Sequence, residues 1–254
     1  MPDPIHSARR SMRGLVIAGA LTLILGLIIS FPARVAYAWF ATPAFSMSGV
    51  TGSVWRGQAS EGAVAGIYLT DLRWRFRPLA LFRGEAAFGI SAQPVSGLID
   101  ADIGVGVGGS VRLSNVSAEL PIRSLERLIP AVNGIDGDMR VQMERVVLEG
   151  GVPVDATGVV NVSNLVIRPI AASVLGDYRA IVETEGQTIR GRVQDTSGVL
   201  EVSGEIELSP DRDFSFIGLI ASRAEAPAAV SDQLQYLGPA DAEGRRSFRL
   251  EGEL

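Results

Sequence analysis

The chain has 254 residues, of which 47% are hydrophobic and 20% charged, a composition typical of a folded protein. It contains no cysteine and a single histidine, His6, which precedes the first hydrophobic segment. These counts exclude disulfides, cysteine-bound metals, thiol nucleophiles and histidine-dependent catalysis in the main body of the chain. All basic residues are arginines, and beyond residue 31 there are 20 arginines against 27 acidic residues. We therefore expect no nucleic-acid partner, because phosphate binding needs a basic face.

An uncharged run of 18 residues covers positions 14–31, about the length that crosses the ~30 Å hydrocarbon core of a bilayer as a helix. Three arginines lie before the run, and only Arg34 follows closely. This excess of positive charge predicts a cytoplasmic tail at residues 1–13, a transmembrane helix at 14–31 and an exported domain at 32–254. A cleaved signal peptide is the alternative, because residues 36–38, Ala-Tyr-Ala, form a small-x-small cleavage pattern.

Short segments of alternating polarity recur through the exported domain, separated by Gly, Asn, Asp and Pro. This pattern predicts an antiparallel sheet with one covered face. Between residues 72 and 77, Leu72, Trp74 and Phe76 alternate with arginines, which places large apolar groups on one face and guanidinium groups on the other. We expect further strands at residues 50–56, 63–69, 86–92, 98–107, 111–120, 139–148, 154–167, 180–185, 190–194, 200–208, 214–222 and at the C-terminus.

Three stretches of the sequence favour a helical conformation. Apolar residues recur at steps of three and four within residues 121–132 and 227–237, and residues 171–175 predict a single helical turn. No rhythm of alternating strands and helices is present, which argues against a nucleotide-binding α/β fold. The predicted fold is therefore all-β, a mainly antiparallel, elongated or curved sheet, with one N-terminal transmembrane helix and a few short helices.

Two kinds of motif have simpler structural explanations. Gly104, Gly106 and Gly109 match a dinucleotide-binding spacing, but no helix is predicted after them, so a strand with one glycine face is favoured. Pairs of acidic residues at 183 and 185, 205 and 207, and 211 and 213 could serve glycoside hydrolysis or bind Ca²⁺. Their positions on strands or in a turn favour solvated faces instead.

Four arginines lie within eleven residues and are interleaved with Trp74 and Phe76. They could bind lipid headgroups or an acidic partner surface, or form a solvated outer face. These candidate contact residues are Arg73, Arg75, Arg77 and Arg83.

Segments near both ends of the domain resemble one known family. Residues 54–59 read Val-Trp-Arg-Gly-Gln-Ala, and a second tryptophan segment follows at 72–81; near the C-terminus, residues 234–239 read Leu-Gln-Tyr-Leu-Gly-Pro. This order is similar to that of the type II secretion system protein N family, where a W-x-G-x-A strand precedes a W-x-x-x-P strand end. The residues that carry the resemblance are Trp55, Gly57, Trp74, Pro78, Gly84, Leu237 and Gly238.

The resemblance implies a non-enzymatic accessory subunit, without cofactor or metal, of the machine that moves folded proteins from the bacterial periplasm across the outer membrane. It implies a single-pass inner-membrane protein with a periplasmic β-rich domain. Its expected partners are inner-membrane platform or secretin-associated subunits, contacted through sheet edges or the anchor helix. The signature residues have architectural explanations: buried rings for Trp55 and Trp74, bends or close strand approach at Gly57 and Gly84, and a strand end at Pro78.

Two other functions remain open at this point. Anchored β-rich periplasmic proteins of the AsmA-like kind bind lipid in apolar grooves, and the alternating strands of this chain suit such a role. A carboxylate-based hydrolase using the acidic pairs is the third hypothesis.

Overall fold

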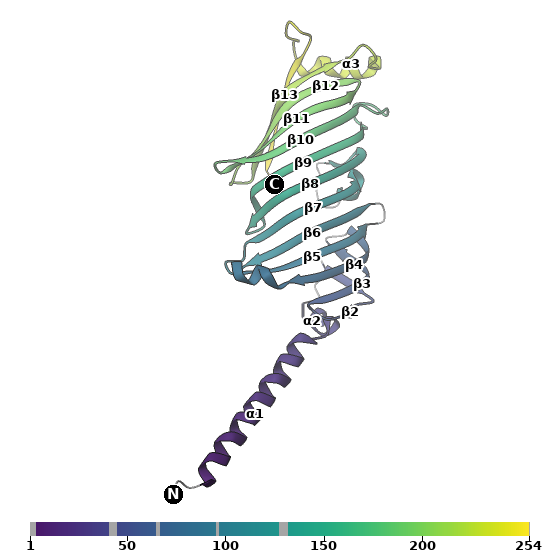
Figure 1. Cartoon of the computed structure of the whole chain (residues 1–254). Coiled ribbons are helices and arrows are strands. Elements are labelled where there is room, and N and C mark those ends of the chain that lie inside the picture. The colour runs from purple at the N-terminus through teal and green to yellow at the C-terminus, as the bar shows by residue number, and fades with distance from the viewer. Residues whose placement is uncertain (1–3, 41–44, 65–66, 95–96, 127–131, 254) are drawn as a thin grey trace.

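In the computed structural model, the chain forms one long, curved antiparallel sheet with a helix projecting from its N-terminal end (Figure 1). The structure describes residues 4–40, 45–64, 67–94, 97–126 and 132–253. The sheet has 14 strands, and from β3 onward each strand pairs with the next along the chain. This up-and-down order explains why short turns suffice between the alternating segments.

The elements have the following bounds. The strands are β1 (Phe45–Ser48), β2 (Thr51–Gly52), β3 (Arg56–Val64), β4 (Ile67–Arg77), β5 (Glu85–Pro94), β6 (Leu98–Gly106), β7 (Val111–Pro121), β8 (Ile135–Glu149), β9 (Val152–Ile167), β10 (Gly176–Glu185), β11 (Thr188–Gly198), β12 (Leu200–Leu208), β13 (Asp213–Ser222) and β14 (Arg246–Glu253). The helices are α1 (Pro4–Ile29), α2 (Ala33–Phe40) and α3 (Ala228–Leu234), with short 3-10 turns η1 (Pro78–Arg83), η2 (Ile122–Leu125) and η4 (Gln235–Leu237).

The uncharged run of the sequence lies mostly in α1, which extends away from the sheet (Figure 1). Its apolar side chains from residue 17 onward are exposed, with Leu21 at 62% and Leu23 at 67%. Among the residues that the structure describes, no helix combines the length and apolarity of a membrane span. The transmembrane helix at residues 14–31 therefore stays a prediction.

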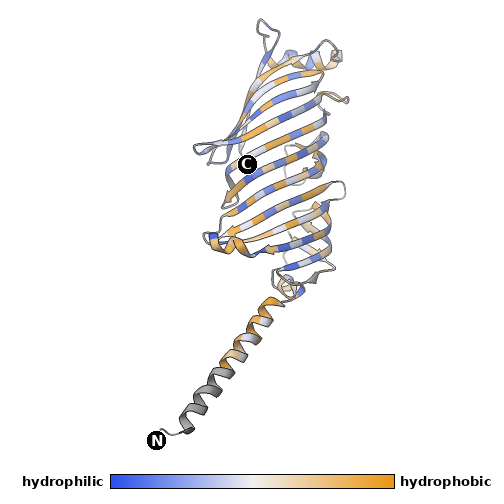
Figure 2. Cartoon of the chain, viewed as in Figure 1, coloured by the Kyte–Doolittle hydropathy of each residue, from blue (hydrophilic) through white to orange (hydrophobic). Residues whose placement is uncertain are grey.

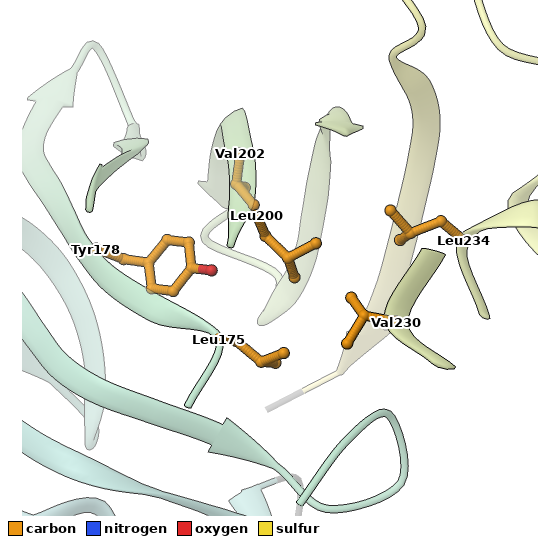
Figure 3. Close-up of a cluster of buried hydrophobic side chains, with 6 residues drawn as sticks. All are labelled: Leu175, Tyr178, Leu200, Val202, Val230 and Leu234. Atoms are coloured by element: carbon orange, nitrogen blue, oxygen red, sulfur yellow. The ribbon is translucent and has the colours of Figure 1, made fainter. Parts of the chain in front are cut away.

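Buried apolar side chains form two clusters at opposite ends of the sheet. The first lies on strands β3, β4 and β5 and is built from Ala59, Leu69, Leu72 and Ala92. The second lies where α3 packs beside β13, over side chains of β10 and β12, and Figure 3 shows its six side chains pointing toward one another. They are Leu175, Tyr178, Leu200, Val202, Val230 and Leu234. The two clusters therefore form the buried core at either end of the sheet, which is a single layer between them.

Between the clusters, one face of the sheet carries a continuous apolar row. Residues directly opposite each other on paired strands have side chains on the same face. Following these pairs from β5 to β14 gives Ala92, Ile99, Ala118, Val141, Val160, Ala180, Val193, Gly204, Gly218 and Phe248. All ten are buried or half-buried, and none is polar. We call this set the apolar row; the alternation that produces it is visible as orange and blue segments along the strands (Figure 2).

Most predicted strands are confirmed, including the C-terminal one and the alternation of residues 72–77, where the apolar side chains are less exposed than the arginines between them. The mainly antiparallel β-class and the short helix within residues 227–237 are also confirmed. Gly104 and Gly106 lie in β6, and a turn to β7 follows them.

Four local predictions are wrong or only partly right. Residues 50–56 are not one strand, because the chain bends at Val54 and Trp55 before β3 begins. Residues 63–69 span the junction between β3 and β4, where Val64 pairs directly with Ile67. Residues 171–175 form no helical turn. Of the helix predicted at 121–132, the structure has only the turn η2, and residues 127–131 lie outside the described residues.

Candidate interaction surface

The candidate contact arginines of the sequence come together beside a surface hollow of about 1360 Å³. Strand β4 alternates, so Arg73, Arg75 and Arg77 project from the face opposite to the apolar row. Arg83 reaches the same hollow from η1, the turn that follows β4. We call this the arginine hollow.

The register of the strands places arginines on one side of the arginine hollow, small residues at its floor and acidic residues on its other side. On the basic side, Arg56 of β3 lies directly opposite Arg75 of β4. Such a like-charge pair lowers stability unless solvent or an anion screens it. The floor has small residues, since Arg75 faces Gly89 and Arg73 faces Ser91.

The acidic side of the arginine hollow lies on β6. Asp102 and Asp100 are the partners of the floor residues on β5. Arg77 reaches across Gly89 to Asp102, with an N–O distance of 2.5 Å, and Asn115 donates a second hydrogen bond to the same carboxylate at 2.9 Å. Arg73 and Arg75 make no ion pair among the described residues. The hollow therefore holds exposed positive charge that its own carboxylates only partly balance.

Arg56 is a member of this surface that the sequence interpretation missed. It lies on a different strand, and its place opposite Arg75 follows from the pairing register of β3 and β4. Local sequence spacing contains no signal for this cross-strand contact.

Trp55 and Trp74 join α1 to the sheet. The indole nitrogen of Trp55 donates to the carbonyl of Ile28, near the C-terminal end of α1, at 2.7 Å. The indole of Trp74 donates to the carbonyls of Ser53 and Val54 at 3.2 and 3.1 Å. Both rings are half-buried, and Trp74 packs against the cluster of Ala59, Leu69, Leu72 and Ala92.

The signature glycines lie where close approach or an unusual backbone is required. A Cβ at Gly57 would lie 2.7 Å from the carbonyl oxygen of Thr51 and would collide with the ring of Trp74. Gly84 ends η1 with φ +73°, in the left-handed region that favours glycine.

The remaining signature residues also mark element ends. Pro78 begins η1 directly after β4, where its missing N–H interrupts no ladder. Leu237 ends η4 and Gly238 follows with φ +105°, its carbonyl accepting a hydrogen bond from Arg246 of β14.

The acidic pairs on the strands face arginines. Arg190 of β11 contacts Glu185 at 2.6 Å, Glu207 at 2.9 Å and Glu205 at 3.4 Å, and Arg192 contacts Glu183 at 3.3 Å. These side chains form a partly exposed cross-strand ion network. In the described part of the chain, no group of three or more potential ligands gathers in a way that could hold a metal ion.

Comparison with known proteins identifies the family. The family described as Type II secretion system (T2SS), protein N matches residues 43–249. The chain belongs to this family. The match begins just before β1 and ends within β14, so it covers nearly the whole sheet.

Three curated relatives carry the name Type II secretion system protein N. The protein of Aeromonas hydrophila is 25% identical, covering 96% of this chain and all of the relative, and that of Vibrio cholerae is 26% identical over 91% and 94%. The protein of Pectobacterium carotovorum is 22% identical over 95% and 98%. No solved structure matches this chain.

Proposed function

We propose that the chain is a non-enzymatic accessory subunit of the type II secretion system, anchored in the inner membrane and acting by binding other subunits from the periplasm. The observation that carries the proposal is the family match over residues 43–249. Chemistry supports the non-enzymatic role, since the sequence has no cysteine and its one histidine, His6, lies outside the sheet.

The anchor of this proposal is the uncharged run at residues 14–31. Its length suits a bilayer, and the arginines before it favour a cytoplasmic N-terminus. Because the chain lacks cysteine, single-cysteine variants can report topology without background. In cells with a permeabilised outer membrane, an impermeant maleimide should label Val174→Cys, whereas Ser7→Cys should react only after lysis. Labelling of Ser7→Cys before lysis would contradict the topology, and loss of that residue from the mature protein would indicate a cleaved signal peptide.

The partner contact is best supported at the β14 edge. At the other end of the sheet, β1 has four residues, and the hydroxyl of Tyr37 accepts the Met47 N–H at 2.9 Å. Among described residues β14 pairs only with β13, so one side of its backbone is available to an added strand. Leu250 on this edge is 60% exposed. A strand from a secretion subunit would extend the sheet there and cover Leu250.

Crosslinking in cells tests this contact. Leu250→Cys, carrying a short thiol-directed photocrosslinker, should capture a type II secretion subunit, whereas Val174→Cys, exposed on a loop, should capture much less. Equal capture at both positions, or capture of no secretion subunit from either, would contradict the β14 contact.

Lipid handling is the second candidate function, and the apolar row supports it. A bilayer lipid could lay its acyl chains along an uninterrupted apolar face that begins at β5 and reaches β14. The matched pair Val160→Asp and Val159→Asp tests this idea, because the two valines are neighbours on β9 that face opposite sides of the sheet. If the row binds lipid, native mass spectrometry should recover less phospholipid with Val160→Asp than with Val159→Asp at equal thermal stability. Equal recovery from both variants would dismiss the lipid function.

A further inference from the structure

We propose that the turn η1, together with the arginine hollow beside it, docks on the surface of a bilayer containing anionic phospholipids. The inference rests on the proposed anchor and adds a second membrane contact to it. Its starting point is three large apolar side chains on one short turn, all exposed to solvent: Leu79 at 74%, Leu81 at 57% and Phe82 at 90%. An exposed cluster of this kind commonly marks a contact surface.

The turn holds these side chains in a fixed outward position. Pro78 starts η1, and Gly84 ends it in a left-handed conformation, its N–H bonded to Leu81 at 2.9 Å. Ala80, within the turn, is 2% exposed and fixes the turn against the sheet. Because the ends and the middle are held, the other side chains of the turn point away from the fold.

The charge around the turn suits an anionic surface. Residues 72–84 contain four arginines and no acidic residue, in a chain whose net charge is −5. Leu79 and Arg83 both line the arginine hollow, so the apolar turn and the guanidinium groups form one continuous surface. Apolar side chains that enter the headgroup region beside arginines that bind phosphates are typical of interfacial membrane contacts.

The position of the turn also favours the bilayer over a protein partner. It joins β4 to β5, and β4 pairs with β3, which directly follows the residues bonded to the end of α1. Helix α1 leaves the molecule from this end of the sheet (Figure 1). The link is direct, since Trp55 bonds to Ile28 of α1 and packs against Phe76 of β4 at 4.9 Å between ring centroids. If α1 spans the membrane, η1 lies in the half of the sheet that is nearer to the bilayer surface (Figure 1).

Site-directed spin labelling of the full chain in vesicles tests the proposal. Phe82→Cys carries the label at the turn, and Tyr236→Cys, 87% exposed at the other end of the chain, is the matched control. In vesicles of phosphatidylethanolamine and phosphatidylglycerol, the label at position 82 should be accessible to oxygen and shielded from a water-soluble nickel reagent. The label at position 236 should show the reverse.

Arginine variants test the charge. Replacing Arg73, Arg75 or Arg83 by Gln should each lower the ratio of docked to undocked turn about fivefold, the equivalent of about 1 kcal/mol per arginine near an anionic surface. A larger loss than that of any single variant should appear for the unchanged chain in vesicles of phosphatidylcholine alone, because all the arginines then lose the anionic surface together.

Two outcomes would overturn the proposal. One is a label at position 82 as exposed to the nickel reagent as the label at 236. The other is a label that becomes shielded only when other secretion subunits are added, which would assign the surface to a protein partner. A label at Leu21→Cys separates this failure from failure of the anchor: a lipid-exposed position 21 with an aqueous position 82 rejects only the docking turn.

Discussion

Trp74 holds three parts of the chain together. Its ring lies against Gly57 of β3, and Trp74 is the partner of Ile90 across β4 and β5. Its indole N–H donates to Ser53 and Val54, the backbone between β2 and β3 that bonds to Phe31 and bridges to Pro32 just after the end of α1. A half-buried aromatic ring with two hydrogen bonds combines apolar burial with backbone satisfaction. The link between the helix and the sheet therefore depends strongly on this one side chain.

Replacing Trp74 by Ala should lower the free energy of unfolding by about 2–4 kcal/mol, somewhat below a fully buried ring because Trp74 is only half-buried. Trp74→Phe should lose only about 1 kcal/mol, since most of the ring remains and the hydrogen bonds are lost. Chemical denaturation in detergent measures both, with Trp39→Ala, 69% exposed, as control. An unchanged stability in Trp74→Ala would contradict the packing described here.

Tyr178 is a buried tyrosine whose hydroxyl has no hydrogen-bond partner among the described residues. It lies in the α3 cluster at 9% exposure. Because an unsatisfied buried hydroxyl costs stability, Tyr178→Phe should leave the free energy of unfolding unchanged or raise it by up to about 1 kcal/mol. A loss of more than about 1 kcal/mol in thermal or urea unfolding would indicate that the hydroxyl has a partner.

The same residue predicts a dependence on alkaline pH. Burial, with a smaller contribution from the charge of Asp195, raises the pKa of Tyr178 from its ordinary value of 10.0 to about 12. The unfolded chain therefore loses this proton near pH 10 while the folded chain keeps it to about pH 12, so stability falls as pH rises through that window. The wild-type chain should lose about 2 kcal/mol more than Tyr178→Phe between these pH values. Parallel pH profiles of the two proteins would contradict this origin.

Among the elements, α3 is the helix that covers the buried cluster near the C-terminal end of the sheet. It is seven residues long, and Val230 and Leu234 are buried against strands β10 and β12. A helix this short is not stable alone, so its packing must supply its stability.

Leu234→Ala should therefore cost about 2–4 kcal/mol and expose the cluster beneath α3. The matched control is Tyr236→Ala, two residues later and 87% exposed, which should change stability by less than about 0.5 kcal/mol. Hydrogen exchange would localise the effect to β10 and β12. Equal effects of the two substitutions would contradict the role of α3.

At this scale, polarity patterns predicted most strands but not every boundary. Residues 63–69 keep an apolar character through the junction of β3 and β4, and the two residues between the strands, Ala65 and Gly66, include no polar turn residue. The bend at Trp55 was equally hidden, because the residues at the bend bond to Ile28 and Phe31, more than 20 residues earlier in the chain. At the bend, long-range contacts override local propensity.

At the scale of the whole molecule, the pairing register of the strands decides which residues form the arginine hollow and the apolar row. The sequence placed three arginines on one face of β4, yet the arginine hollow depends on Arg56 opposite Arg75 and on Asp100 and Asp102 two strands away. The apolar row likewise exists only because nine successive registers agree. Such cross-strand alignment follows from turn geometry and bulges, among them the shift beside Asp71, whose φ is +48°.

These surfaces, in a protein with no cysteine and one histidine, lead to the central claim that the chain acts by binding within the secretion apparatus. Affinity capture of the intact, full-length chain from its own cells, followed by quantitative mass spectrometry, tests this claim most directly. We predict enrichment of inner-membrane platform or secretin-associated subunits over an untagged control strain. Enrichment of lipid-transport components alone, without any secretion subunit, would contradict it.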